Sequence, residues 1–174
     1  MKTLNKSLRI SISLILLISL FNCSSDNDII ESNNDSNRIE FDGQIYQIND
    51  GFFESGNYNE FSMALFPKGI SINYDSNYYI NGGNWYLEID EIISDDNTIE
   101  GTYTSGEDVF GYFINNAQFL DDVLLPGKIV QEINKEGTLT INKIGIEYEV
   151  IYETFDNRNN AFTAYYKGPL VSRR

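Results

Sequence analysis

The sequence contains no histidine and a single cysteine, Cys23, among its 174 residues. Histidine is the usual general base near neutral pH and the commonest metal ligand. Its absence excludes a catalytic triad with histidine, and with one cysteine it excludes zinc sites built on histidine or paired cysteines. A disulfide within the chain is also excluded. The fold must therefore rest on its apolar core, and chemistry can come only from carboxylates, hydroxyls and aromatic rings.

Basic residues are scarce as well, with 12 Lys and Arg against 26 Asp and Glu, a net charge of −14. All 26 acidic residues follow Asn22, and nine basic residues do so too, which gives that part of the chain a net charge of −17. Such a surface repels the phosphates of nucleic acids and anionic lipid headgroups. The charge therefore argues against a nucleic-acid partner and against membrane adsorption of the folded part.

The first 22 residues have the pattern of a signal peptide. Lys2, Lys6 and Arg9 precede an apolar run over residues 10–21. As a helix this run would rise about 18 Å, short of the ~30 Å hydrocarbon core of a bilayer. A basic start followed by a short apolar run is typical of a secretory signal rather than a transmembrane span.

The end of the apolar run, Leu20-Phe21-Asn22-Cys23, resembles the lipobox of bacterial lipoproteins. That motif usually has glycine, alanine or serine where Asn22 stands. The resemblance implies that Cys23 is acylated and becomes the N-terminus after cleavage, so that lipid on Cys23 anchors the protein in a membrane. An ordinary signal peptide with an incidental cysteine is the alternative.

Residues 23–37 are predicted to be a disordered acidic tether. Residues 24–37 hold four acidic residues, no basic one and only two apolar ones. Such a segment buries too little surface to offset the entropy of ordering. The serine and acidic residues after Cys23 also resemble the surface-export signal of Bacteroidota lipoproteins. This resemblance implies an outer-membrane location, exposed on the cell surface.

Residues 38–174 are predicted to form a single antiparallel β domain, because apolar and polar residues alternate with period two and long helical periodicity is absent. Asp42-Gly43 predicts a hairpin turn, and Gly168-Pro169 is expected to end the last strand. About ten short strands at 8–12-residue spacing are typical of a barrel or sandwich. The expected strands cover residues 39–41, 46–48, 61–65, 70–74, 85–90, 99–103, 129–133, 139–141, 146–152 and 162–166.

Part of this body resembles small β-rich lipoproteins of Bacteroidota whose domains are calycin-like, or lipocalin-like, barrels. The likeness is carried by the spaced segments GTYT, GTLTINK, IEYEVIYETF and AFTAYYKGPL. It implies an all-β, antiparallel up-and-down barrel or half-barrel, with a two-sheet β-sandwich as the alternative. Members of that group are mostly of unassigned function, so the resemblance implies no catalytic residue.

Aromatic residues gather around a flexible turn, where Tyr79, Trp85 and Tyr86 flank residues 81–84, Asn-Gly-Gly-Asn. Rings beside amide side chains can stack on sugars or line an apolar pocket mouth. The three aromatic residues are therefore the candidate ligand-binding residues. Alternation places Trp85 and Tyr86 on opposite faces, and we expect Trp85 to pack in the core.

Carboxylates offer two further possibilities, and simpler explanations account for both. Paired carboxylates can hydrolyse glycosidic bonds, but Glu147, Glu149 and Glu153 alternate outward along a strand as a solvated face. The loops at residues 94–101 and 155–160 gather oxygen atoms. In the first, however, Ile99 breaks the EF-hand spacing, and in the second Arg158 opposes a cation. Turn chemistry explains these loops, so neither a metal site, a cofactor nor a catalytic residue is predicted.

The sequence thus favours a lipid-anchored, non-enzymatic β domain at the cell surface that binds a small ligand or glycan, or a protein partner. One alternative is a packed barrel that acts through its loops as an accessory or adhesion subunit of a surface complex. A carboxylate-dependent glycoside hydrolase ranks third. A barrel of about eight strands can enclose one small ligand or be filled by its own side chains.

Overall fold

The computed structural model describes residues 37–73, 79–120, 123–124 and 126–173, which belong to one compact unit, Asp35–Arg174. The expected signal peptide, Cys23 and all but the last residue of the expected tether lie outside the described residues. The part of the chain that the structure describes contains no helix with the length and apolarity needed to cross a bilayer.

The described residues form strands and no helix, which confirms the all-β prediction, and the strands make two six-stranded sheets and one four-stranded sheet. In order across each sheet, sheet A consists of β2 (Gln44–Gln47), β1 (Arg38–Phe41), β15 (Ala161–Gly168), β14 (Glu147–Phe155), β13 (Gly137–Ile144) and β8 (Gly101–Thr104). Sheet B consists of β12 (Ile129–Glu132), β9 (Phe110–Asn115), β7 (Trp85–Ile93), β4 (Glu60–Phe66), β3 (Asp50–Ser55) and β16 (Val171–Arg173). Sheet C consists of β11 (Val123–Leu124), β10 (Phe119–Leu120), β6 (Tyr79–Gly82) and β5 (Ile70–Asn73).

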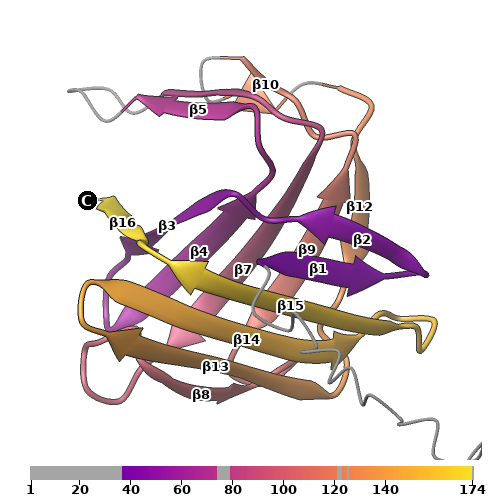
Figure 1. Ribbon diagram of the computed structural model, residues 1–174. Helices are drawn as coiled ribbons and strands as arrows, with labels where there is room; N and C mark the ends of the chain where they lie inside the picture. Colours follow the sequence, from indigo (N-terminus) through magenta and orange to yellow (C-terminus); the bar gives the residue numbers. More distant parts are fainter. Residues whose placement is uncertain (1–36, 74–78, 121–122, 125, 174) are drawn as a thin grey trace, which may run out of the picture. The chain divides into compact units, whose positions relative to one another are not determined.

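Sheets A and B pack face to face, with β13, β14 and β15 in front of the strands of sheet B in Figure 1. The inward residues of both sheets share one buried cluster, in which Ile39 and Leu87 are fully buried. The Phe113 ring lies 5.8 Å from the Phe41 ring and 5.7 Å from the Phe162 ring. Of the two possibilities for the interior, the described residues favour the second, because the space between the sheets is filled by their own side chains.

The two large sheets remain separate and keep their own edges, which fits a half-barrel or a β-sandwich. Sheet A has β2 and β8 as its edge strands, and sheet B has β12 and β16. Gly168-Pro169 ends β15 as expected, but the expectation that this is the last strand is wrong. The chain continues into β16, which pairs in parallel with β3. The short sequence Val-Ser-Arg has no periodicity of its own, so only this distant pairing makes it a strand.

Sheet C covers part of the outer face of sheet B. Phe66 and Tyr86 of sheet B belong to a second buried cluster, against which Ile70 of β5 and Leu124 of β11 pack. The Tyr86 ring lies 5.3 Å from the Phe66 ring. Sheet B is therefore apolar on both faces at this end, which alternation alone does not predict.

The hairpin of β1 and β2 forms at the predicted turn. Asp42 and Gly43 have φ angles of 50° and 69°, the left-handed conformation that a two-residue hairpin turn requires. Just before β1, the Asn37 side chain donates to the carbonyl oxygen of Lys167 at 3.1 Å and accepts from the Lys167 N–H at 2.7 Å. These two bonds fix the point at which the chain enters the sheet.

Candidate functional site

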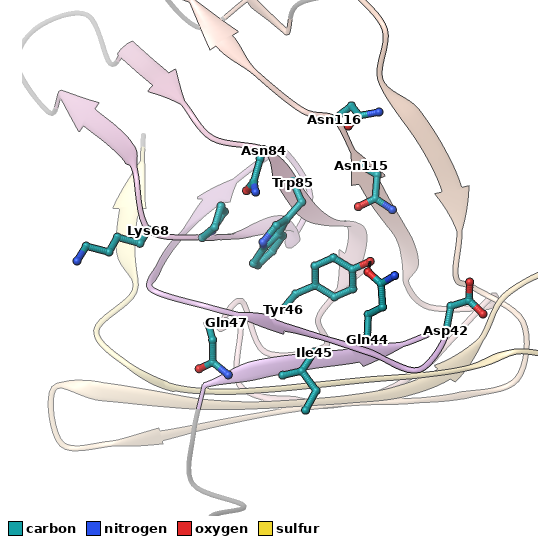
Figure 2. Close-up of a pocket in the computed structure, with 11 residues that line it drawn as sticks. Asp42, Gln44, Ile45, Tyr46, Gln47, Lys68, Asn84, Trp85, Asn115 and Asn116 are labelled. Atoms are coloured by element: carbon teal, nitrogen blue, oxygen red, sulfur yellow. Dashed lines mark hydrogen bonds between the residues drawn. The ribbon is translucent and has the colours of Figure 1, made fainter.

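An open groove of about 680 Å³ runs along β2, the edge strand of sheet A (Figure 2). All four residues of β2 line it, together with Asp42 of the hairpin turn. The remaining lining residues are Pro67 and Lys68 after β4, Asn84 and Trp85 at the start of β7, and Asn115 and Asn116 at the end of β9. The groove therefore lies between one edge of sheet A and the strand ends of sheet B.

The hairpin register decides which β2 side chains enter the groove. Gln44 pairs with Phe41 and Tyr46 pairs with Ile39, and both partners on β1 are buried in the core. Directly paired residues share a face of the sheet, so the side chains of Gln44 and Tyr46 point inward. The Tyr46 hydroxyl donates to Gln44 Oε1 at 3.0 Å, which fixes both side chains in the groove.

Aromatic rings form the floor of the groove. The Tyr46 ring lies edge-on to the Trp85 ring at 6.0 Å and to the Phe113 ring at 4.9 Å. Trp85 is only 4% exposed and packs 5.9 Å from Phe113, which confirms the expectation that it is a core residue. Because Trp85 presents so little surface, it supports the groove rather than offering a broad face for a sugar ring to stack on.

Amide side chains form the wall opposite β2. Asn84 and Asn116 are exposed and Asn115 is half-buried. The carbonyl oxygen of Asn84 accepts a 3.2 Å hydrogen bond from the N–H of Ala117, which joins the start of β7 to the end of β9. Primary amides both donate and accept hydrogen bonds, so this wall suits a polar ligand with donors and acceptors side by side.

The structure separates two of the three aromatic residues that the sequence suggested as a site, Trp85 and Tyr86. Trp85 lines the groove, whereas Tyr86 lies on the opposite face of sheet B, buried beside Phe66. Burial, followed by the negative charges of Glu88 and Asp90, raises the pKa of Tyr86 well above its ordinary value. The backbone of Tyr79 belongs to β6, but its side chain lies outside the described residues. Tyr86 therefore does not share a site with Trp85.

Sequence reasoning did not find most of the groove. Gln44, Tyr46, Asn115 and Asn116 lie in segments far apart in the chain, and no local pattern joins them. The signal that could have placed Gln44 and Tyr46 is the Asp42-Gly43 turn, because it fixes the register of the hairpin and hence their inward direction. No comparable signal marks Asn115 and Asn116.

Half-buried carboxylates occupy the outer face of sheet B, away from the groove. Glu88 and Asp90 alternate along β7 with the fully buried Leu87 and Ile89. Burial, with a further contribution from the Asp90 charge, raises the pKa of Glu88 to about 7. Burial likewise raises the pKa of Asp90. Neither carboxylate lines the groove, so the groove residues and the carboxylates of raised pKa form two separate sets.

The carboxylates in the two oxygen-rich loops bond within their own turns, as turn chemistry predicts. Asp96 accepts hydrogen bonds from the hydroxyls of Thr98 and Ser94, and these bonds lower its pKa. Burial disfavours ionisation of Asp156, but hydrogen bonds from Asn160 and the Arg158 N–H outweigh it and lower the pKa. Among the residues that the structure describes, no group of three His, Cys, Asp or Glu side chains is arranged to hold a metal ion.

Comparisons with protein-family models, with curated proteins and with solved structures found no match to this chain.

Proposed function

We propose that the protein is a non-enzymatic binding domain that takes a polar ligand, which is a small molecule, a glycan or a segment of a protein partner, in the groove along β2. The observation that carries the proposal is the composition of the groove. The amide side chains of Gln44 on β2, Asn84 just before β7 and Asn115 on β9 line a common groove of about 680 Å³ with the rings of Tyr46 and Trp85. Small-molecule sites commonly occupy about 300–1,000 Å³ and combine an apolar floor with a few convergent polar groups.

The packed interior favours a surface groove over an enclosed cavity as the binding site. The inward side chains of sheets A and B fill the described core. This packing favours a ligand that binds at the edge of the domain, where Gln44, Asn84 and Asn115 can supply hydrogen bonds. The same packing favours the second candidate function, an accessory or adhesion subunit that acts through its surface within a larger complex.

Lipid attachment at Cys23, together with export to the cell surface, would place this groove outside the cell. We propose that Cys23 carries the membrane anchor and that the acidic segment after it holds the domain away from the outer membrane, on the cell surface. Hydrolysis of a glycosidic bond remains the third candidate. Glu88 has the raised pKa that a general acid needs, but it lies on the face of sheet B away from the groove.

The single tryptophan makes the proposal directly testable. Trp85 is the only tryptophan and lies in the groove, so its fluorescence reports on this site alone. The full chain, purified in mild detergent, is titrated with a panel of neutral, amino and acidic oligosaccharides, and with calcium and a chelator. A saturable change in Trp85 emission with a member of the glycan panel supports the proposal.

Matched amide variants locate the binding. Asn115→Ala removes a groove amide, whereas Asn142→Ala removes an exposed amide from β13, which does not line the groove. We expect the first change to weaken binding about tenfold, the effect of losing a well-formed hydrogen bond, and the second to leave it unchanged. Equal effects of the two substitutions, or no response of Trp85 to any oligosaccharide or peptide, would contradict the proposal.

A further inference from the structure

Among the residues that the structure describes, no strand pairs with the outer edge of β2, which presents peptide groups to the groove. Ile48 N–H donates to the carbonyl oxygen of Asn37 at 2.9 Å, and in an antiparallel ladder every second residue pair is hydrogen-bonded. The Asn37–Ile48 pair is hydrogen-bonded, so the pairs two and four residues further along β1, Ile39–Tyr46 and Phe41–Gln44, are hydrogen-bonded as well. The peptide groups of Tyr46 and Gln44 therefore face β1. Those of Ile45 and Gln47 must face away from β1, toward the outer edge.

Side-chain directions support this assignment. In Figure 2 the side chains of Ile45 and Gln47 point away from the groove, whereas those of Tyr46 and Gln44 point into it. Ile45 and Gln47 nevertheless line the groove, so they contribute their main chain to its wall. Two N–H and C=O pairs, two residues apart on one strand, are the pattern that an added β-strand recognises.

The opposite wall of the groove also carries hydrogen-bonding groups. An extended peptide has hydrogen-bonding groups along both edges, and one edge would pair with Ile45 and Gln47. The side-chain amides of Asn84, Asn115 and Asn116 line the far side of the groove and can donate to and accept from the other edge. A sugar ring would find polar groups here too, but Trp85, the larger of the two aromatic rings that line the groove, is buried and offers little face for stacking.

Edge strands are usually protected against such pairing by charged residues, proline or bulges. On the edge strand β16, Arg173 lies over the Phe52 ring at 4.4 Å and forms a 3.2 Å ion pair with Glu54. In contrast, β2 has the sequence Gln-Ile-Tyr-Gln, with neither charge nor proline, and its exposed Ile45 is 63% accessible. Its register with β1 is continuous, without a bulge. Within the described residues, the device that protects β2 is its shortness.

Charge selects the occupant. Two copies of this chain, each with a net charge of −14, repel one another. Residues 24–36 of the same chain carry four acidic residues and no basic one, so they are unsuited as well. A segment of another protein that contains lysine or arginine and favours an extended conformation is attracted by the acidic domain and can form the ladder.

We propose that the groove along β2 binds an extended, basic peptide segment of a partner protein by strand addition, through the outward peptide groups of Ile45 and Gln47. This inference rests on the proposed function of the groove as a binding site and names the class of its ligand. Glycan binding in the same groove is then an outcome of the test.

The probe is a displayed library of random heptapeptides selected against the full chain in mild detergent. The selected peptides are synthesised together with versions N-methylated at alternate positions, one version for each edge. We expect enriched peptides to contain lysine or arginine and β-branched residues. On binding, hydrogen exchange of the Ile45 and Gln47 amides slows at least about tenfold, as for amides that enter a sheet. N-methylation of the edge that faces β2 abolishes binding.

Two variants of one residue separate the peptide group from the side chain. Ile45→Pro removes the outward N–H without removing a bond to β1, and edge strands tolerate proline at such positions. Ile45→Val keeps the N–H. We expect about a tenfold loss of peptide affinity for the first and little change for the second. Asn84→Ala weakens the same peptides from the opposite wall and leaves β2 intact.

The outcomes distinguish the inference from the proposed function. If oligosaccharides change Trp85 emission while no selected peptide protects Ile45 and Gln47, strand addition is wrong and the binding groove stands. If neither oligosaccharides nor peptides affect Trp85, both fail. If the two amides become protected with rising protein concentration alone, the occupant is a second copy and the basic partner is wrong.

Discussion

The hydroxyl of Tyr152 donates a 2.8 Å hydrogen bond to the carbonyl oxygen of Ile133 inside the core. The Ser105 hydroxyl lies 2.8 Å from the same phenol oxygen and 3.0 Å from the Thr154 hydroxyl. Tyr152 is fully buried on β14 of sheet A, and Ile133 directly follows β12 of sheet B. This network therefore joins the two large sheets through polar groups within an otherwise apolar core.

Tyr152→Phe should destabilise the protein by about 1–3 kcal/mol, because the buried Ile133 carbonyl and Ser105 hydroxyl each lose a partner. The free energy of unfolding in urea measures the effect. Tyr165→Phe is the control, since the Tyr165 hydroxyl bonds Glu149 at 3.2 Å at the half-exposed surface of sheet A. Equal losses for the two variants would show that the buried network contributes nothing special.

Glu88 should make the protein more stable in mild acid than at neutral pH. Its pKa rises from 4.5 to about 7 on folding, so the folded state holds the proton more tightly than the unfolded state. The free energy of unfolding therefore falls as the pH rises between these two values, and the full penalty is present above pH 7. Asp90, whose pKa is also raised, acts in the same direction.

Glu88→Gln removes this penalty and should stabilise the protein at pH 8 by about 1–2 kcal/mol, allowing for solvent screening of a half-buried carboxylate. At pH 4.5 the substitution should have little effect. Glu147→Gln, at an exposed site on β14, removes the same charge without releasing a buried group. Urea midpoints at both pH values measure the difference, and a gain that is equal for both variants would trace it to net charge alone.

Asp156 should stabilise its turn only while ionised. Its carboxylate accepts hydrogen bonds from the Arg158 and Asn160 N–H groups at 2.8 and 2.7 Å, and its pKa is lowered. Asp156→Ala should cost about 1–3 kcal/mol at pH 7. Because the contribution disappears as the pH falls through the lowered pKa, the variant and the natural protein should converge in acid. Asp95→Ala, at an exposed loop position, is the matched control.

Cys23→Ser should release the protein from membranes or block its processing, because a serine cannot carry the thioether-linked lipid. Each methylene buried by an acyl chain contributes about 0.8 kcal/mol, so several chains together make a stable anchor. Fractionation of cells that express each form measures the effect. A Cys23→Ser variant that still fractionates with membranes would contradict lipid attachment at this residue.

Local signals predicted the parts of the fold that depend on neighbouring residues. The Asp42-Gly43 turn predicted the β1–β2 hairpin, and period-two alternation placed Trp85 and Tyr86 on opposite faces. Strand pairs between distant segments could not be predicted in this way. For example, β16 is a strand only because it pairs with β3. Tyr86 is buried because sheet C covers the outer face of sheet B, and the residues around Tyr86 in the sequence do not predict this contact.

The groove escaped prediction for the same reason. Its polar groups come from β2, the loop after β4, and the ends of β7 and β9, so the site exists only once the two sheets have packed. Of the aromatic residues that the sequence suggested, Trp85 does line the groove, but it lies buried in the floor of the groove. The outward direction of the Ile45 and Gln47 peptide groups cannot be predicted from residue types, because every residue has a peptide group.

The clamp between Asn37 and Lys167 has a mechanical consequence. Tension that reaches the domain from the preceding chain arrives at Asn37, next to β1, which is bonded on one side to β15 and on the other to β2. Pulling along β1 loads both ladders in shear, so their bonds resist together instead of opening one after another. A pull along β1 would therefore meet the combined resistance of the β1–β15 and β1–β2 ladders before β1 leaves the sheet.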